Sequence, residues 1–331
     1  MVRARAGTRH ETFERSPCLW TAGPGRVSIA RMPASSRTAA FEAFVAPACA
    51  RPALWRTALG AAFAAALWLL TVGATLPFAV RAGGFATPTG VLLYLASFAG
   101  LAAGIVLAAG LLQGRGPATL FGPGGFRAGG FGLGVAVVLL VAIPSGAALA
   151  LLAPPERQAT LAAWTARLPL ALPAILVQSA AEELAFRGFL MQSLAARFRS
   201  ALVWWLLPAA FFGVLHWNPA ELGPNAPIGV LITMVIGLAL ADVTVRTGNL
   251  SAPIGLHFAN NAMAMLVVAP PSPVSGLALF VSGIDAGDAG TLRLLLVADL
   301  TAILLVWGLW RAILARREKR RRLHSEGAGS I

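Results

Sequence analysis

The stretch from residue 168 to residue 194 reads LPLALPAILVQSAAEELAFRGFLMQSL. It is long enough to cross the hydrocarbon core of a membrane, which takes about 20 helical residues. Its polar side chains include those of Gln178, Glu182, Glu183 and Arg187. An ionisable group inside a membrane helix costs about 2.5–3.5 kcal/mol by insertion scales and usually marks a functional site. The stretch therefore predicts a membrane-spanning helix that carries a polar site.

The composition of the whole chain agrees with a membrane location. Of the 331 residues, 57% are hydrophobic and only 12% are charged, and the mean hydropathy is +0.75. A soluble domain carries about twice that share of charged residues. The excess apolar surface must therefore face lipid. We predict an all-α fold, a polytopic membrane helical bundle.

Eight apolar runs are candidate transmembrane helices, and turn-forming residues separate them. They cover approximately residues 58–80, 89–113, 131–153, 168–194, 201–217, 226–246, 252–268 and 292–314. The fifth and seventh runs are short, which favours helices packed inside the bundle. We expect a basic, disordered amino-terminal segment over 1–55, the transmembrane bundle over 56–315 and a basic cytoplasmic tail over 316–331.

The basic residues concentrate at the two ends of the chain. The formal net charge is +13, a balance that nucleic-acid-binding proteins share. Cationic ends on an apolar body instead indicate that both termini stay in the cytoplasm. Eight spans also place both termini on one side, and the loops on that side hold Arg115, Arg127, Arg197, Arg199 and Arg246. The sequence predicts an inner-membrane protein with no nucleic-acid partner.

Residues 1–50 contain no continuous apolar segment followed by a cleavage site, so we predict no removable signal peptide. Met32 is an alternative start of the chain. The richness in Arg, Ala and Gly, together with a single lysine, indicates a bacterial genome of high GC content.

The two adjacent glutamates of the fourth run have different expected roles. Glu183 and Arg187 are four residues apart, share a helix face and can form an ion pair. Glu182 points about 100° away around the helix. A carboxylate without a cationic partner that faces the interior of a bundle suits general acid or base chemistry. Glu182 is therefore the candidate for chemistry, and Glu183 the candidate for structure.

Two histidines and an asparagine interrupt two further apolar runs. His216 ends the fifth run, while His257 and Asn261 lie four residues apart on one face of the seventh. A carboxylate, two imidazoles and an amide in one bundle core would supply a base, a second acid or base, and donors for a developing oxyanion.

Each of these features also has a structural interpretation. A single histidine inside a membrane more often makes a hydrogen bond between helices than it takes part in catalysis, and the Glu183–Arg187 pair alone is more often structural. Asp242 and Asp299 receive no role. The combination favours chemistry, because each polar side chain adds its own cost in the membrane.

Three motifs occur in order, each in an apolar run: Glu182-Glu183-x-x-x-Arg187, Phe212-x-x-x-His216 and His257-x-x-x-Asn261. They resemble the motifs of the CPBP family, the CAAX prenyl endopeptidases and bacteriocin-processing enzymes, also called the type II CAAX or ABI family of intramembrane proteases. The resemblance covers roughly residues 165–268, the expected catalytic core, which is about a third of the chain.

The resemblance implies a hydrolase, an intramembrane endopeptidase of about eight transmembrane helices. The implied catalytic residues are Glu182, which activates water, His216, which acts with it, and His257 and Asn261, which hold the oxyanion. The implied supporting residues are Glu183 and Arg187, which hold the helix, and Phe212, which packs. No residue of the motifs departs from the family pattern.

The use of a metal stays open at this stage. Glu182, His216 and His257 would hold zinc or another divalent metal with a free position for water. They come from three separate runs, without the His-Glu-x-x-His pair that pre-sets two ligands on one helix. The resemblance equally implies a glutamate mechanism without metal, and we favour a site that requires no cofactor.

Other function classes also compete. The same bundle would serve as a non-enzymatic membrane immunity or scaffold protein, although a scaffold has no need to bury four polar side chains. A proton-coupled transporter is a third reading, but no pair of inverted halves is visible. The expected partners are the lipid bilayer and a peptide or membrane-protein substrate, such as a bacteriocin precursor or a peptide pheromone.

Overall fold

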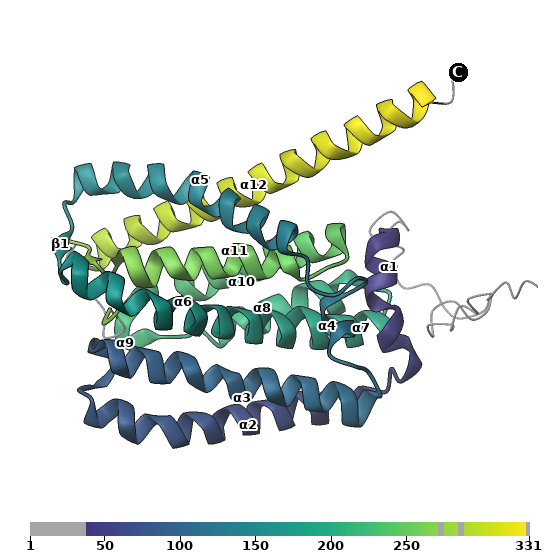
Figure 1. The fold of residues 1–331 in the computed structure, drawn as a ribbon, viewed down its shortest axis with the longest axis horizontal. Coiled ribbons are helices and arrows are strands. Elements are labelled where there is room, and N and C mark those ends of the chain that lie inside the picture. The colour runs from purple at the N-terminus through teal and green to yellow at the C-terminus, as the bar shows by residue number, and fades with distance from the viewer. Residues whose placement is uncertain (1–37, 271–274, 284–287, 329–331) are drawn as a thin grey trace, which may run out of the picture.

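A computed structural model of the protein describes residues 38–270, 275–283 and 288–328. Within them the helices run back and forth along one axis (Figure 1). The main helices are α2 (Leu54–Arg81), α3 (Pro88–Gln113), α5 (Ala128–Leu152), α6 (Leu161–Glu183), α7 (Gln192–Arg197), α8 (Leu207–Val214), α10 (Ala226–Thr247), α11 (Ser251–Ala262) and α12 (Ala289–Ala328). In this described part, six helical stretches are long and apolar enough to cross a membrane. The predicted polytopic helical bundle is confirmed.

The two short apolar runs behave differently from each other. The seventh run contains α11, whose residues from Ser251 to His257 are all buried, as predicted for a helix enclosed by the bundle. The fifth run contains α8, which exposes Leu207 by 56%, Phe211 by 50% and Val214 by 59%. The prediction that the fifth run is enclosed is therefore wrong. Its outward face is apolar and suits contact with lipid.

Small residues set how closely the helices approach. A Cβ atom on Gly104 of α3 would lie 2.6 Å from Cα of Ala64 on α2, and one on Gly255 of α11 would lie 2.2 Å from the carbonyl oxygen of Phe131 on α5. Helix packing in membranes depends on such small residues, because lipid provides no hydrophobic drive between helices. Gly255 thereby lets α11 lie close to α5, deep in the bundle, where α11 carries His257.

Three π-helical segments interrupt the α-helices. Leu184–Met191 joins α6 to α7, Leu202–Leu206 precedes α8, and Met263–Val267 follows α11. Such wide turns are rare and often occur at functional sites. The apolar pattern of the sequence did not predict them. The first begins directly after Glu183, so the motif from Glu182 to Arg187 starts in an α-helix and ends in a π-helix.

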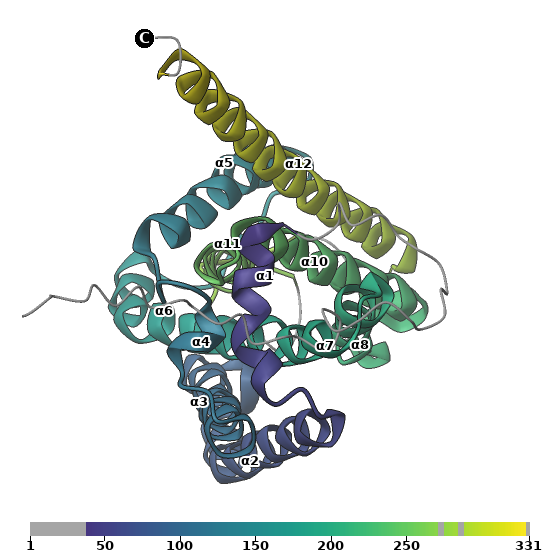
Figure 2. The same cartoon turned by 90° about the vertical axis from the view of Figure 1, so that its right-hand side faces the viewer.

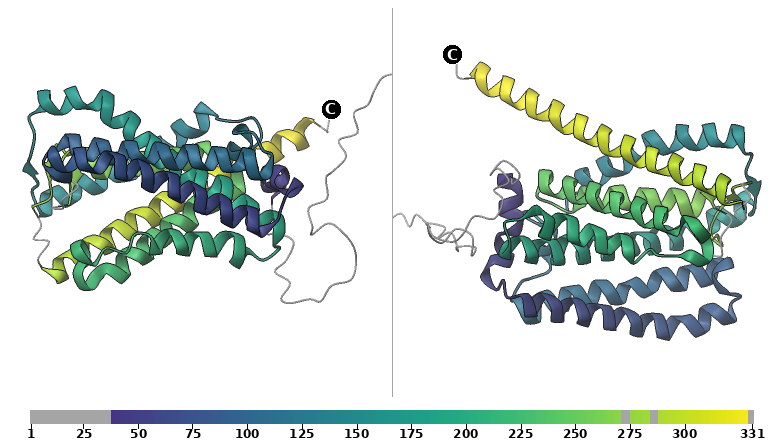
Figure 3. Two further views of the ribbon diagram at one scale, coloured as in Figure 1. Left: turned by 90° about the horizontal axis from the view of Figure 1, so that it is seen from below. Right: turned by 180° about the vertical axis from the view of Figure 1, so that it is seen from behind.

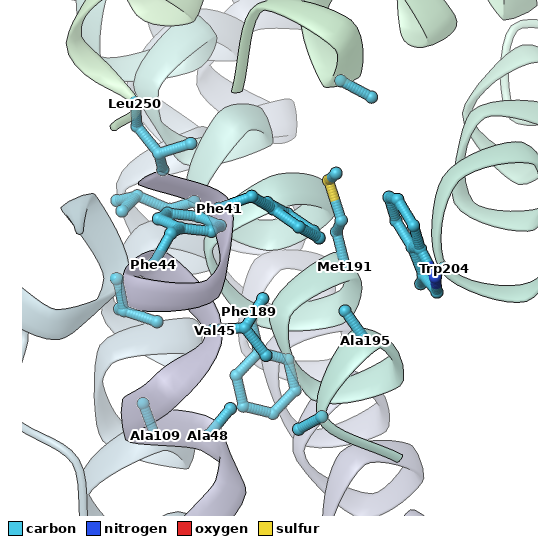
Figure 4. Close-up of a cluster of buried hydrophobic side chains, with 14 of the residues drawn as sticks. Phe41, Phe44, Val45, Ala48, Ala109, Phe189, Met191, Ala195, Trp204 and Leu250 are labelled. Atoms are coloured by element: carbon cyan, nitrogen blue, oxygen red, sulfur yellow. The ribbon is translucent and has the colours of Figure 1, made fainter. Parts of the chain in front are cut away.

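The helix α1 (Ala39–Val45) and the following 3-10 turn (Ala46–Ala50) lie across one end of the bundle (Figure 2). Phe41 and Phe44 are fully buried, and the Phe41 ring packs 4.8 Å from the ring of Trp204 (Figure 4). The prediction of a disordered segment over 1–55 is therefore wrong for Ala39–Ala50, because its aromatic side chains bury in the core. Residues 1–37 lie outside the described residues.

A small three-stranded sheet lies at the opposite end (Figures 1 and 3). Its order is β1 (Glu156–Arg157), β3 (Phe280–Val281) and β2 (Val268–Ala269), with β1–β3 antiparallel and β2–β3 parallel. The sequence did not predict it, because strands of two residues are too short to show an alternating pattern. The sheet joins the loop before α6 to the chain that follows α11.

The last helix, α12, is attached to the bundle and then leaves it (Figure 1). Nε1 of Trp307 donates to Oδ2 of Asp242 on α10 at 2.9 Å, and Trp310 is fully buried. Asp242 also binds Arg246, as its spacing predicts. The helix continues to Ala328, through most of the segment predicted as a basic tail. Two short helices, α4 (Ala118–Phe121) and α9 (Pro219–Leu222), lie in the loops.

Candidate active site

Glu183 lies at the end of α6, fully enclosed, and forms an ion pair with Arg187. Nη1 of Arg187 donates to Oε1 of Glu183 at 2.8 Å, and both side chains are buried. Nη2 of Arg187 also donates to the carbonyl oxygen of Gly237 on α10 at 3.0 Å. The pair expected from the i, i+4 spacing is therefore present, and it ties α6 to α10.

His257 bridges the two glutamates from α11. Its Nδ1 lies 2.9 Å from Oε1 of Glu183, and its Nε2 lies 3.5 Å from Oε2 of Glu182. A carboxylate paired with arginine accepts hydrogen bonds and does not donate them, so Nδ1 carries a proton that it donates to Glu183. The second imidazole nitrogen is thereby turned toward Glu182. Oε2 of Glu182 is buried and has no hydrogen-bond partner among the described residues.

The charges of this cluster do not balance without an additional proton. Two carboxylates and the guanidinium of Arg187 carry one net negative charge when His257 is neutral. An uncompensated buried charge is costly. Binding of one proton, on Nε2 of His257 or on Glu182, makes the cluster neutral, and the two sites face each other. The geometry therefore suits transfer of a proton between a carboxylate and an imidazole.

Asn261 joins the site from the next turn of α11. Its Nδ2 donates to Oε1 of Gln178 at 2.8 Å, and Gln178 lies one turn before Glu182 on α6. Gln178 thus fixes the amide of Asn261 close to the glutamates and leaves one of its two N–H groups for another acceptor. The sequence analysis identified Gln178 as a polar residue of an apolar run but gave it no role. Its position four residues before Glu182, on the same helix face, is the signal that could have indicated one.

His216 stands apart from the glutamates. It is exposed at the end of α8, and its Nδ1 lies 2.8 Å from the carbonyl oxygen of Phe212, which only accepts, so its Nε2 is the free nitrogen. The ring of Phe212 lies 4.7 Å from the ring of His216 and 6.1 Å from that of His257, with distances taken between ring centroids. Phe212 therefore packs between the two histidines. No hydrogen bond or ion pair joins His216 to Glu182 among the described residues.

The expected metal ligands do not form a metal site in this arrangement. Within the described part of the chain, no group of three His, Cys, Asp or Glu side chains is close enough to hold an ion. Nδ1 of His257 is bound to Glu183, and Nδ1 of His216 is bound to the carbonyl oxygen of Phe212. The donor set thus does not fit a three-ligand zinc site.

One structural partner of the site could not be read from the sequence. Gly237 supplies the carbonyl oxygen for Arg187 and lies in the middle of an apolar helix. A Cβ atom there would lie 3.0 Å from Cβ of Ala209 on α8. The glycine therefore permits the close contact of α8 with α10 that brings Phe212 to the cluster.

The fold and the site together define a polytopic membrane protein with a buried Glu–Glu–Arg–His cluster in its bundle. Residues 163–263 match the family described as type II CAAX prenyl endopeptidase Rce1-like. This region therefore resembles the CAAX family, as the three motifs predict. The matched region contains every residue of those motifs, whereas α2, α3 and α5 lie outside it.

A Bacillus subtilis (strain 168) protein, described as uncharacterized protein YyaK, is 31% identical over 106 residues. The match covers 32% of this chain and 36% of that protein, so it spans about a third of the relative's length. No solved structure matches the chain.

Proposed function

We propose that the chain is an intramembrane endopeptidase in which Glu182 activates water. The observation that supports this most is the unpaired, buried oxygen of Glu182, which faces Nε2 of His257 at 3.5 Å. Polar atoms buried in protein normally have partners. A buried carboxylate oxygen without one suits a transient ligand, such as the water that a general base must hold.

In the proposed reaction Glu182 takes a proton from water, and the resulting hydroxide attacks the carbonyl carbon of a peptide bond. The negative charge that develops on the carbonyl oxygen is stabilised by the remaining N–H of Asn261 and by His257 in its protonated form. Collapse of this intermediate breaks the carbon–nitrogen bond, and Glu182 returns the proton to the leaving nitrogen. The resemblance of the motifs also gives His216 a role at this water, and that role requires its free Nε2 to move past the Phe212 ring toward Glu182.

The supporting shell explains why Glu182, and not Glu183, is the base. Oε2 of Glu183 is also buried without a partner, but Oε1 of Glu183 accepts from both Arg187 and His257, so the charge of this carboxylate is already compensated. Glu183 holds the imidazole in one orientation, as a carboxylate commonly does for a working histidine. We propose no cofactor. The substrate is a peptide or a membrane protein, and its identity is to be found by the experiment below.

The test compares the protein termini in membranes that contain the wild-type chain or its Glu182→Gln variant. New termini that appear only with the wild type are the expected products, because glutamine cannot accept the proton. Glu156→Gln is the matched control, since Glu156 is exposed on β1, and it should cleave like the wild type. Cleavage that survives Glu182→Gln would exclude the mechanism, and a phenotype insensitive to both Glu182→Gln and His216→Ala would favour a scaffold.

The same assay after exhaustive chelation tests the metal. Full cleavage is expected, because the proposed base and the oxyanion donors are side chains of the protein. If chelation abolished cleavage and one divalent metal restored it, the site would bind a metal. Glu182, His216 and His257 would then have to come closer together than they are in this structure.

A further inference from the structure

Two side-chain contacts, one helical turn apart, join α6 to α11 at the site. Nε2 of His257 lies 3.5 Å from Oε2 of Glu182, and Nδ2 of Asn261 donates to Oε1 of Gln178 at 2.8 Å. Residues 178 and 182 share a face of α6, and residues 257 and 261 share a face of α11. The carboxamide of Gln178 therefore lies one turn from the proposed base, against the proposed oxyanion donor Asn261.

Hydrogen bonds fix which end of the Gln178 carboxamide is the oxygen. Its Oε1 accepts from Asn261 and also from the hydroxyl of Ser179 at 3.2 Å. The oxygen of Asn261 in turn accepts from Nδ2 of Asn260 at 3.4 Å, so the nitrogen of Asn261 is the end that faces Gln178. The other end of the Gln178 carboxamide is therefore the NH2 group, which offers two donors.

The nitrogen of Gln178 has no hydrogen-bond partner among the described residues, although the side chain is only 8% exposed. It is not one of the unpaired polar atoms that are completely enclosed, in contrast to Oε2 of Glu182, so a ligand can reach it. Buried donors normally have partners, and one left unpaired is costly. A purely structural role explains the oxygen of Gln178 and leaves its nitrogen unexplained.

We propose that Gln178 is a further catalytic residue, whose Nε2 donates to the oxyanion together with Asn261. The inference rests on the proposed endopeptidase function. When the hydroxide formed at Glu182 adds to the peptide carbonyl, the electron pair of the C=O bond moves to the oxygen. Two carboxamide N–H groups, held side by side by the bond between Gln178 and Asn261, then stabilise this charge. Their orientation is set before substrate binds.

A double-variant comparison separates a donor from a residue that only orients Asn261. If Gln178 only orients Asn261, Gln178→Met has no further effect in a chain that already carries Asn261→Ala, because nothing is left to orient. If Gln178 donates to the oxyanion itself, the double variant is slower than Asn261→Ala alone.

The first experiment measures cleavage of a peptide that spans a site found by the comparison of termini. Gln178→Met should lower kcat by about 100-fold, as removal of one oxyanion donor does, with KM unchanged because the oxyanion exists only in the transition state. In the Asn261→Ala chain the same exchange should lower kcat by a further 10-fold or more.

Gln113→Met is the matched control. Gln113 is also a buried glutamine, but its amide binds Arg115 and Ser193 at the end of α3. Its exchange should leave kcat at the wild-type value. Thermal unfolding of each variant shows whether the chain is folded at the assay temperature.

A second variant keeps the oxygen of residue 178 and removes only its donor. Gln178→Glu still offers an acceptor to Asn261 and Ser179, but its carboxylate cannot donate to an oxyanion and repels it. We expect a loss of kcat at least as large as in Gln178→Met. Wild-type kcat in Gln178→Glu would overturn the inference.

Binding of a transition-state analogue tests the donor without turnover. In this probe a phosphonate replaces the peptide bond that is cleaved, so that it carries a charged oxygen on a tetrahedral centre. Such analogues depend on the contacts that the transition state makes. Gln178→Met should weaken direct binding of the phosphonate by about 100-fold, and Gln113→Met should not. Equal binding to the wild type and to Gln178→Met would overturn the inference.

The outcomes distinguish this inference from the proposed function. An unchanged kcat in Gln178→Met, while Glu182→Gln abolishes cleavage, removes Gln178 from the reaction and leaves the endopeptidase intact. A double variant as fast as Asn261→Ala alone also overturns the donor role. Cleavage that survives Glu182→Gln instead defeats the proposed function.

Discussion

Arg187 is the residue on which the orientation of the cluster depends. Its guanidinium donates to Glu183 from one nitrogen and to the carbonyl of Gly237 from another. It also lies over the Phe212 ring, with 5.2 Å between the guanidinium carbon and the ring centroid. Three elements therefore meet at one planar cation. Lysine, with a single compact ammonium, cannot make these contacts together.

Arg187→Lys should therefore reduce both stability and cleavage. We expect a loss of about 1–3 kcal/mol in the free energy of unfolding, the cost of a charged hydrogen bond left unmade in a buried place, and a decrease in kcat of at least about 10-fold. Thermal unfolding and product formation in the same preparation measure the two effects.

Arg246→Lys is the matched control. Its partner Asp242 is also four residues away, but the Arg246 side chain is 33% exposed, so the change should be small. Equal effects at the two positions would contradict the assignment.

Part of the site follows from sequence spacing, and part does not. The Glu183–Arg187 pair follows from the i, i+4 rule, since both residues lie on one helix. The contact of His257 with Glu183 joins residues that are 74 positions apart, so no local rule predicts it. His216 shows the converse: its motif is intact, yet its Nδ1 binds the backbone of its own helix. Only the three-dimensional arrangement tells these histidines apart.

At the scale of elements, the contact of α8 with α10 positions the second motif. A Cβ atom on Gly213 would lie 2.6 Å from the carbonyl oxygen of Val230. Gly213 directly follows Phe212 and precedes His216 by one turn, so a side chain there would push both away from α10.

Gly213→Val should displace α8 and lower the cleavage rate, because the valine side chain would overlap with the backbone of α10. We expect about 1–3 kcal/mol of destabilisation, as for overpacking of a buried position, together with loss of most activity. Gly73→Val is the matched control, because nothing lies within 4 Å of a Cβ atom at that helical glycine of α2. Unfolding temperature and cleavage rate report the difference, and a silent Gly213→Val would show that α8 tolerates movement.

The apolar runs predicted the helices because each membrane span needs a long hydrophobic segment. A search for long hydrophobic segments does not find short elements or changes of helix type. The two-residue strands carry no period, and the π-helical segment Leu184–Met191 uses the same residue types as an α-helix. The segment Ala39–Ala50 was missed for another reason: it is apolar but too short to span a membrane, and it directly follows a stretch rich in arginine.

At the scale of the whole molecule, charge is distributed unevenly between the two ends of the bundle. The described N-terminal helix α1 and the end of α12 lie at the same end (Figure 1). The loops that connect α3 to α5 and α7 to α8 are at that end and contain Arg115, Arg127 and Arg199. Arg197 and Arg246 lie in the last turns of α7 and α10 at the same end. Burial lowers the pKa of Arg115 to about 10, so it is still charged at neutral pH. The opposite loops carry Glu156, Glu221 and Asp288 beside their basic residues.

This asymmetry predicts that the α1 end faces the cytoplasm, because loops rich in arginine and lysine are retained on that side. Fusions of a reporter that is active only outside the cytoplasm provide the measurement. We expect no activity after Arg199 or at the carboxyl terminus, and activity at Gln158, in the loop before α6. The control for the charge effect replaces both Arg197 and Arg199 with Gln. This change should weaken the preference of the α1 end for the cytoplasm without reversing it, because the other arginines at that end still favour retention. Activity after Arg199 in the wild-type chain would invert the proposed topology. It would also place the exposed His216, which lies at the other end of α8, on the cytoplasmic side of the membrane.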